Sequence, residues 1–312
     1  MSQPSIEILL AVYNGGLFLP RQLASIAAQT YPNWTILARD DGSTDDSMAI
    51  LEEFAIRHPG KMKIIRSNKN LGVIGNFDAL IQASSAPYLS FCDQDDIWDF
   101  DKLEISLQKM QEMEKGLPKE IPLLVHSDLR LADDHNRLIH PSYWNFTRIF
   151  PSKTTTLNRL LAQNVVTGCA MFCNRALVMQ ASPLPKEALM HDWWIALVAA
   201  GIGKIGVIDK QTLSYRQHEN NTLGAIKFGT MEHIRASMDR IKELSEKKQL
   251  QAKTFKQRYY NLLNPKDQEV LDIYLSLNTM GFIRSRWNIL RHGLWKQGLL
   301  RQLAALAYVK QP

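Results

Sequence analysis

The sequence predicts an α/β fold, in which a mostly parallel central sheet is flanked by helices and followed by a C-terminal helical extension. Short apolar runs alternate with helix-like segments over the first two-thirds of the 312 residues, with a spacing of about 30 residues typical of strand–helix units. Polar clusters follow several of these runs, as they do at the carboxyl ends of parallel strands. Beyond residue 226 the sequence becomes charged and helix-prone.

The individual elements follow from local patterns. Six apolar runs are predicted as strands: Ile6–Tyr13, Trp34–Asp40, Lys63–Arg66, Tyr88–Cys92, Leu123–His126 and Ile205–Ile208. A turn at residues 14–16 leads from the first strand into a helix. The stretch DDGSTDDS after the second strand offers Ser43 or Thr44 as a helix N-cap, with acidic residues suited to the helix dipole. Further helices are expected to end at Ala83 and to begin near Asp192.

Composition restricts the class of protein. With 45% hydrophobic residues, the chain can bury a full core as one large domain or as a domain with an appendage. The N-terminal sequence lacks the basic segment of a signal peptide, and no apolar run approaches the roughly 20 residues of a membrane-spanning helix. Three cysteines without the spacing of a zinc site fit a reducing, cytosolic setting.

The net charge of +6 is concentrated at the C-terminal end. Residues 225–312 carry 16 basic and 7 acidic residues, and no acidic residue follows Asp272. We therefore expect a second part, residues 226–312, that is basic, amphipathic and helical. A single helical stripe would hold the apolar residues Ile283, Trp287, Leu290 and Leu294. Gly293 and Gly298 are expected to break or bend this helix.

Three carboxylates crowd the end of the fourth strand. Asp93, Asp95 and Asp96 lie within four positions, and like charges at this spacing raise one another's pKa. Asp93 and Asp95, separated by Gln94, point to the same side in extended geometry. They could bind Mg²⁺ or Mn²⁺ with room left for substrate phosphates. A solvated acidic turn explains the triplet equally well when it is taken alone.

Other polar residues at predicted strand ends and helix starts have two interpretations each. Asp41 could accept a hydrogen bond from a base imide or a ribose hydroxyl, or form an Asx turn. His191 and Asp192 come just before a helix, where an aspartate is usually a cap. Arg216 suits a diphosphate and His218 a metal, although both would also fit a polar surface loop.

In combination and in this order, these segments resemble the GT-A family 2 inverting glycosyltransferases. The matching segments are AVYNGGLFLPRQLASIAAQTYPNWTILARDDGSTDDS, SNKNLGVIGNFDALIQASSAPYLSFCDQDDIW, MHDWW and YRQHENN, between residue 6 and about residue 222. The DQDDIW–HDWW–YRQH arrangement is similar to that of bacterial rhamnosyltransferases of surface-polysaccharide assembly. The resemblance implies a GT-A catalytic domain over residues 1–225 and a nucleotide-diphosphate sugar as donor.

The resemblance also implies roles for individual residues. The nucleotide-binding set would be Val12, Tyr13, Asn14, Asp41, Asn70, Asn76, Asp93, Gln94 and Arg216. Within this set, Asp41 would read the imide of a pyrimidine base. The metal ligands, for Mg²⁺ or Mn²⁺, would be Asp93, Asp95 and His218.

The acceptor side of the implied site depends on one segment. Asp192 would be the catalytic residue, as the general base that removes the proton of the acceptor hydroxyl. Trp193 and Trp194 could stack on an acceptor sugar, or pack in the core. Many relatives carry Glu-Asp where this chain has His191-Asp192, so the base assignment depends on Asp192 alone.

The function implied is metal-dependent, inverting transfer of a sugar to a hydroxyl of a lipid-linked or oligosaccharide acceptor in bacterial surface-polysaccharide (O-antigen, capsule or exopolysaccharide) synthesis. Rhamnose from dTDP-rhamnose is the first choice of donor, and UDP-Gal, UDP-Glc or UDP-GlcNAc is the alternative. A non-catalytic nucleotide-binding or assembly subunit is the competing interpretation, although it would not need Asp192. A phosphatase of the DxDx[TV] type is disfavoured, because its motif follows the first strand.

The basic C-terminal region has its own interpretation. Its lysines and arginines, with Trp287 and Trp295 among leucines, suit contact with an anionic membrane surface. We therefore expect a cytoplasmic protein, peripheral on the cytoplasmic face of the inner membrane. The alternative is a helix pair that packs on the catalytic domain with its basic face in water. Nucleic acid is not expected as a partner, because no nucleic-acid-binding motif is present.

Overall fold

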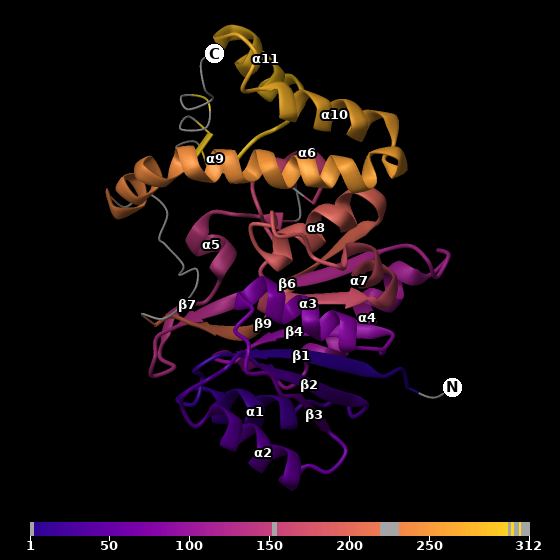
Figure 1. Cartoon of the computed structure of the whole chain (residues 1–312), viewed down its shortest axis with the longest axis vertical. Coiled ribbons are helices and arrows are strands. Elements are labelled where there is room, and N and C mark those ends of the chain that lie inside the picture. Colours follow the sequence, from indigo (N-terminus) through magenta and orange to yellow (C-terminus); the bar gives the residue numbers. More distant parts are fainter. Residues whose placement is uncertain (1–2, 152–154, 219–230, 299–300, 303–305, 307–312) are drawn as a thin grey trace.

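The computed structural model describes residues 3–151, 155–218, 231–298, 301, 302 and 306, and for residues 231–243 the backbone alone. Its strands are β1 (Ile6–Val12), β2 (Trp34–Asp40), β3 (Met62–Ile65), β4 (Tyr88–Asp93), β5 (Ile97–Trp98), β6 (Leu123–Ala132), β7 (Leu138–His140), β8 (Met171–Asn174) and β9 (Lys204–Arg216). They form one sheet in the order β3-β2-β1-β4-β8-β6-β9-β5, with β7 paired to β6 (Figure 1).

Helices cover this sheet and continue beyond it. They are α1 (Leu19–Ala27), α2 (Ser47–Arg57), α3 (Gly72–Ala83), α4 (Lys102–Glu114), α5 (Tyr143–Thr147), α6 (Leu157–Ala162), α7 (Arg175–Ala181), α8 (His191–Ile202), α9 (Met231–Tyr259), α10 (Pro265–Ser276) and α11 (Phe282–Arg291). Two 3₁₀ turns, η2 (Gly168–Ala170) and η3 (Tyr260–Leu262), precede β8 and follow α9. The α/β class that the sequence predicts is therefore confirmed.

The sheet changes direction at β8. Strands β3, β2, β1 and β4 are mutually parallel, and β6 is parallel to β9. Strand β8 runs antiparallel to both of its neighbours, β4 and β6. Because of this reversal, the start of β8, and not its end, lies beside the carboxyl end of β4. The turn η2 is thereby brought to the edge of the sheet at which parallel strands carry their ligand sites.

The predicted strands are all present, and two are longer than expected. β6 continues past His126 to Ala132, and β9 continues past Ile208 to Arg216, with shifts of register near Asp128. Pairing between these two strands sustains them beyond their apolar cores. Helix α2 begins at Ser47 with Asp46 at the N-cap, so the expected Ser43 or Thr44 cap is wrong. Ser43 instead accepts a hydrogen bond from the backbone N–H of Asn14 at 2.8 Å.

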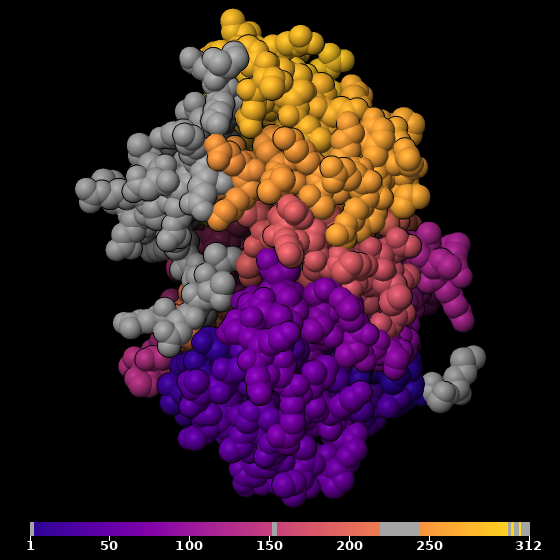
Figure 2. All heavy atoms as spheres, in the orientation of Figure 1, coloured from indigo at the N-terminus to yellow at the C-terminus, as the bar shows by residue number. Residues whose placement is uncertain are grey.

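Two apolar cores lie on the two faces of the sheet. One packs α1, α2 and α4 against the sheet, and the other gathers α3, α6, α7 and α8. The second core includes residues of α9 and α10, such as Phe255, whose ring centroid lies 6.0 Å from that of Trp194. Figure 2 shows the C-terminal helices (orange to yellow) seated on the part of the chain that contains α7 and α8. The predicted boundary between residues 225 and 226 lies outside the described residues.

Helix α11 ends where the glycines predict. α11 stops at Arg291, and Gly293 (φ +64°) and Gly298 (φ +89°) adopt left-handed conformations beyond it. Of the predicted apolar stripe, Leu294 is buried after the helix end, whereas Ile283 and Trp287 are 83% and 62% exposed. The helix buries Ser285, Asn288 and Ile289 in their place, so the stripe on α11 itself faces away from the core.

Candidate active site

A cleft of about 550 Å³ opens at the carboxyl ends of β1 and β4. Ten of the residues predicted from the sequence line it: Val12, Tyr13, Asp41, Asn70, Asn76, Asp93, Gln94, Asp95, Asp192 and Trp193. Four other predicted residues, Asn14, Trp194, Arg216 and His218, are not among the described residues that line it. The fold therefore joins strand-end residues from the first third of the chain to the start of α8.

One wall of the cleft is held by contacts between turns. Gln94 accepts a hydrogen bond from the backbone N–H of Tyr13 at 2.7 Å and donates to the Tyr13 carbonyl at 2.9 Å. Asn14, in a left-handed conformation (φ 49°), accepts a hydrogen bond from the N–H of Thr44 at 2.8 Å. Asn14 thus fixes the turn after β1 to the DDGSTDDS stretch and does not itself reach the cleft.

Asp41 joins β2 to the start of α3. Its two carboxylate oxygens accept hydrogen bonds from the N–H groups of Leu71 and Gly72, each at 2.8 Å. The guanidinium of Arg39 forms a buried ion pair with Asp41 and donates to Asn76 at 3.0 Å. Asp41 lines the cleft while making these contacts, and its reading of a base imide stays a prediction.

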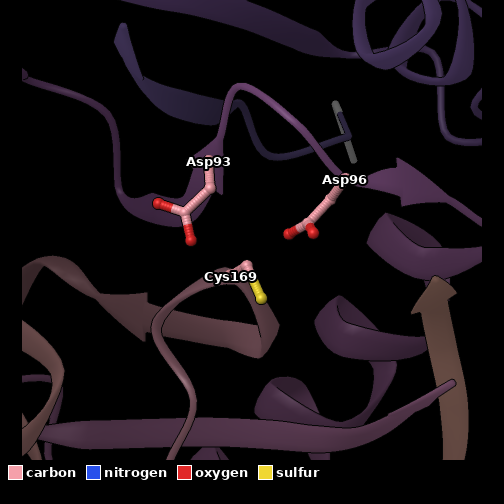
Figure 3. Close-up of side chains that lie close together, drawn as sticks. All are labelled: Asp93, Asp96 and Cys169. Carbon is pink, nitrogen blue, oxygen red and sulfur yellow. The ribbon is translucent and has the colours of Figure 1, made fainter. Parts of the chain in front are cut away.

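The acidic turn after β4 is electrostatically strained. Burial, then the Asp95 and Asp192 carboxylates, raises the pKa of Asp93 to about 7. Burial and the two neighbouring carboxylates also raise the pKa of Asp96 well above its usual value, and its Oδ2 has no partner among the described residues. Figure 3 shows the Asp96 carboxylate pointing toward Cys169 of η2, with Asp93 beside it. Ligand atoms of these three residues lie within 4.8 Å of one another.

The residues present fit a divalent cation. Two crowded carboxylates, the half-buried Asp93 and the buried Asp96 with its unpartnered oxygen, gain stability from a positive charge. The predicted ligands Asp95 and His218 contact each other, with 2.8 Å between His218 Nε2 and Asp95 Oδ2. His218 and Asp93 do not fall in one such group among the described residues. The set Asp93, Asp95 and His218 stays a prediction.

Arg216 holds this acidic turn through backbone carbonyl groups. Its Nε donates to the Asp95 carbonyl at 2.8 Å and its Nη1 to the Asp134 carbonyl at 2.7 Å. The side chain is buried, and its guanidinium carbon lies 4.8 Å from the centroid of the Phe18 ring. In this arrangement Arg216 orients the turn, and the diphosphate contact expected of it stays a prediction.

Asp192 is positioned at the start of α8. Its oxygens accept hydrogen bonds from Asn164 Nδ2 at 3.1 Å and from the N–H of Gly168 at 3.0 Å. Burial raises the pKa of Asp192 to about 7, against the lowering by its hydrogen bonds. A carboxylate with a pKa near neutrality is suited to accept a proton at physiological pH. Asp192 is also close enough to Asp93 to raise the pKa of that residue.

The neighbouring residues divide between the cleft and the core. His191 is buried, its ring is stacked on Phe77 with 4.0 Å between centroids, and burial lowers its pKa to about 3. Trp193 lines the cleft while its Nε1 donates to the Leu160 carbonyl at 2.7 Å. Trp194 is fully buried and donates to the Ala181 carbonyl at 3.0 Å. Of the two roles expected for these tryptophans, Trp194 has the role of core packing, and stacking on an acceptor sugar stays a prediction for Trp193 alone.

Sequence reasoning missed Asn164, Gly168 and Cys169. They precede β8, which is antiparallel, so the rule that sites follow the ends of parallel strands does not find them. The available signal was the stretch NVVTGC, in which polar residues flank a short apolar run. Its position beside Asp93 comes from long-range strand pairing alone.

Solved structures of other proteins share the fold of this chain. The structure resembles that of Staphylococcus aureus TarS residues 1–349, solved with UDP-GlcNAc, with a TM-score of 0.58 over 93% of this chain and 89% of that one at 14% identity. It also resembles the mannosyltransferase PcManGT from Pyrobaculum calidifontis, solved with GDP-Man and Mn²⁺, with a TM-score of 0.60 over 99% and 76% at 14% identity. These likenesses establish a GT-A fold.

The sequence comparisons specify the family. Residues 7–178 match the model of glycosyl transferase family 2, and the chain belongs to this family. It is 28% identical over 228 residues to the dTDP-rhamnosyl transferase RfbG of Shigella flexneri, an alignment that covers 69% of this chain and 74% of that protein. The expectation of a GT-A glycosyltransferase of family 2 is thereby confirmed.

Proposed function

We propose that this glycosyltransferase moves a sugar from a nucleotide diphosphate to an acceptor hydroxyl with inversion at the anomeric carbon. The observation that carries the proposal is the placement of Asp192 in one cleft with the carboxylates of the turn after β4. Asp192 can accept a proton there, and the carboxylates of the turn can hold the cation that accompanies a diphosphate. An assembly subunit without turnover would have no use for a proton acceptor such as Asp192.

In this reaction, the acceptor oxygen forms a bond to the anomeric carbon while the bond from that carbon to the diphosphate oxygen breaks. Asp192 takes the proton of the acceptor hydroxyl as the attack proceeds. Asn164 and the Gly168 N–H hold both oxygens of this carboxylate and so fix its direction. Because a single displacement inverts the anomeric centre, no second carboxylate is needed as a nucleophile.

A divalent cation, Mg²⁺ or Mn²⁺, fits the acidic turn. Asp93 and Asp95 would hold it, with His218 as a further candidate ligand beside Asp95. When bound, such a cation stabilises the negative charge of a departing diphosphate. Arg216 keeps the turn in position through the Asp95 carbonyl.

The donor we favour is dTDP-rhamnose, because the relative RfbG is named a dTDP-rhamnosyl transferase. A UDP-sugar such as UDP-GlcNAc, UDP-Glc or UDP-Gal is the alternative, because TarS was solved with UDP-GlcNAc. The acceptor we favour is a lipid-linked oligosaccharide in bacterial surface-polysaccharide synthesis. This choice rests on the resemblance of the cleft segments to enzymes of that process.

We further propose that the C-terminal region contacts the cytoplasmic face of the inner membrane. Among the described residues, no helix has the length and apolar character required to cross a bilayer. α11 nevertheless exposes Phe282, Ile283, Trp287 and Leu290, and Trp295 is exposed just beyond it. Arginines at 284, 286 and 291 flank these side chains. An apolar face bordered by basic residues is typical of helices that lie in the interface of an anionic membrane.

The proposed function is tested by calorimetric titration of UDP, dTDP and GDP, each with Mn²⁺, Mg²⁺ or a chelator. We expect metal-dependent binding to the wild type and its loss in Asp95→Ala, with a preference for dTDP if the sugar is rhamnose. Lys253→Gln, an exposed change on α9, serves as the control. Absence of nucleotide binding with every metal would refute the proposal.

A further inference from the structure

Three basic side chains gather beside the cleft: Lys248 of α9, and Lys296 and Arg301 beyond α11. We call them the cation cluster. Lys248 Nζ donates to the Ala162 carbonyl at 3.1 Å and lies 5.0 Å from the centroid of the Trp193 ring. Arg301 Nη1 donates to the Thr147 carbonyl at 2.7 Å and to the carbonyl of Gln297, the neighbour of Lys296, at 3.4 Å.

The cation cluster is connected to the cleft through residues 162–164. Ala162 accepts the hydrogen bond from Lys248, and Gln163 accepts one from the Gln297 N–H at 2.8 Å. The next residue, Asn164, holds Asp192. Figure 1 shows the segment after α11 (yellow) returning to α9 and α6. The cation cluster therefore contacts the segment that leads to Asn164, and Lys248 lies over the ring of Trp193, which lines the cleft.

The two lysines of this cluster have no acidic partner among the described residues. In the part of the chain that the structure describes, no carboxylate forms an ion pair or hydrogen bond with Lys248 or Lys296. Burial, and then the Lys296 ammonium, lowers the pKa of Lys248 well below its usual value. Burial, and then the Arg301 guanidinium, lowers the pKa of Lys296. Half-buried like charges of this kind are destabilising unless an anion accompanies them.

We propose that the cation cluster binds a phosphate or diphosphate group of the acceptor. This inference rests on the proposed function, because it specifies the chemistry of the acceptor in that reaction. Lys248 and Lys296 offer point charges, and Arg301 offers the planar guanidinium that suits a phosphate. A saccharide linked to a diphosphate would place this anion on the cluster and a sugar hydroxyl near Asp192.

The test measures binding of inorganic pyrophosphate to the full chain by calorimetry, with a chelator present so that the acidic turn holds no metal. We expect the wild type to bind pyrophosphate. The affinity falls by about tenfold in Lys296→Gln and further in the double variant Lys248→Gln/Lys296→Gln, as charge-assisted contacts are lost. Lys253→Gln, which removes an exposed lysine of the same helix, leaves the affinity unchanged.

Two further measurements keep the outcomes distinct. If the double variant binds nucleotide in the presence of Mn²⁺, it is folded. If the wild type does not bind nucleotide with Mn²⁺, the proposed function is refuted, and not the role of the cation cluster. Binding to phosphatidylcholine vesicles with and without phosphatidylglycerol separates the two sources of phosphate. Unchanged pyrophosphate affinity in the double variant, or a loss confined to vesicle binding, would overturn the assignment to the acceptor.

Discussion

At the scale of single residues, the proposed chemistry depends on Asp192. We expect Asp192→Asn to retain nucleotide binding and to lose transfer by about 10²–10⁴-fold, because the amide cannot accept the proton. Calorimetry and a transfer assay on the same preparation measure the two effects. Equal loss of binding and transfer would indicate a structural role.

The substitution Asp192→Asn is also expected to change the thermal stability of the protein. Burial raises the pKa of Asp192 from 3.8 to about 7, so its ionisation destabilises the folded state progressively as the pH rises through this window. Asn carries no charge and avoids this cost. We therefore expect the melting temperature of Asp192→Asn at pH 8 to equal or exceed that of the wild type. A lower value would mean that the hydrogen bonds of the carboxylate outweigh its desolvation.

The raised pKa also predicts the pH dependence of the reaction. Asp192 must be deprotonated to act as a base, so kcat should fall as the pH decreases below about 7, approaching a tenfold loss per pH unit. The measurement is kcat at saturating donor, acceptor and metal. A profile that is flat from about pH 5 to 8 would contradict the assignment of the base.

Gly168 is required by close packing. A Cβ at this position would lie 2.7 Å from His191 Nε2 and 3.7 Å from Asp192 Cβ. Gly168→Ala should therefore displace the imidazole and misdirect the base, with a loss of kcat of about 10²-fold for a shift of about 1 Å. Gly281→Ala, before α11 with φ −57° and nothing within 4 Å of an added Cβ, tests for general effects of replacing a glycine. Equal kcat in the two variants would show that the contact is unimportant.

At the scale of elements, Asp41 joins β2 to α3. Removing its side chain in Asp41→Ala leaves the Leu71 and Gly72 N–H groups without their acceptor. It also removes the carboxylate that forms an ion pair with the buried Arg39 guanidinium. Breaking a buried ion pair by removing one partner costs about 3–5 kcal/mol, and we expect this decrease in the free energy of unfolding in urea. Asp267→Ala, a change of a half-buried aspartate in the first turn of α10, should cost about 1 kcal/mol or less. Similar losses in both variants would refute the role of Asp41.

At the scale of the whole molecule, the exposed face of α11 sets the proposed orientation on a membrane. Ile283→Ser/Trp287→Ser should reduce binding to vesicles that contain phosphatidylglycerol, because it removes the two most exposed apolar side chains of this helix. Co-sedimentation measures the binding to vesicles. The binding that persists in high salt is the apolar contribution, and the binding lost between low and high salt is the ionic contribution. Leu138→Ser, an exposed apolar residue on β7, is the matched control. Equal binding by the two variants would exclude α11 as the contact.

Much of the fold was predictable because its signals are local. The strands alternate with helices at regular spacing, and parallel strands bring their carboxyl ends to one edge. For this reason Asp41, Asp93 and Asp95 could be placed near one another before the structure was considered. The start of β8 could not be placed, because an antiparallel strand presents its beginning at that edge, and only pairing with β4 positions Gly168 and Cys169 there.

By itself, the sequence determined the α/β class, the acidic turn after the fourth strand and the basic character of the C-terminal region, because each follows from the order of residue types along the chain. The tertiary structure alone decided which side chains face the cleft. Neighbours on a helix point about 100° apart, so Trp193 reaches the cleft while Trp194 fills the core. Contacts between distant segments join Lys248 to Ala162 and Gln297 to Gln163, just before Asn164, and no local pattern specifies such contacts.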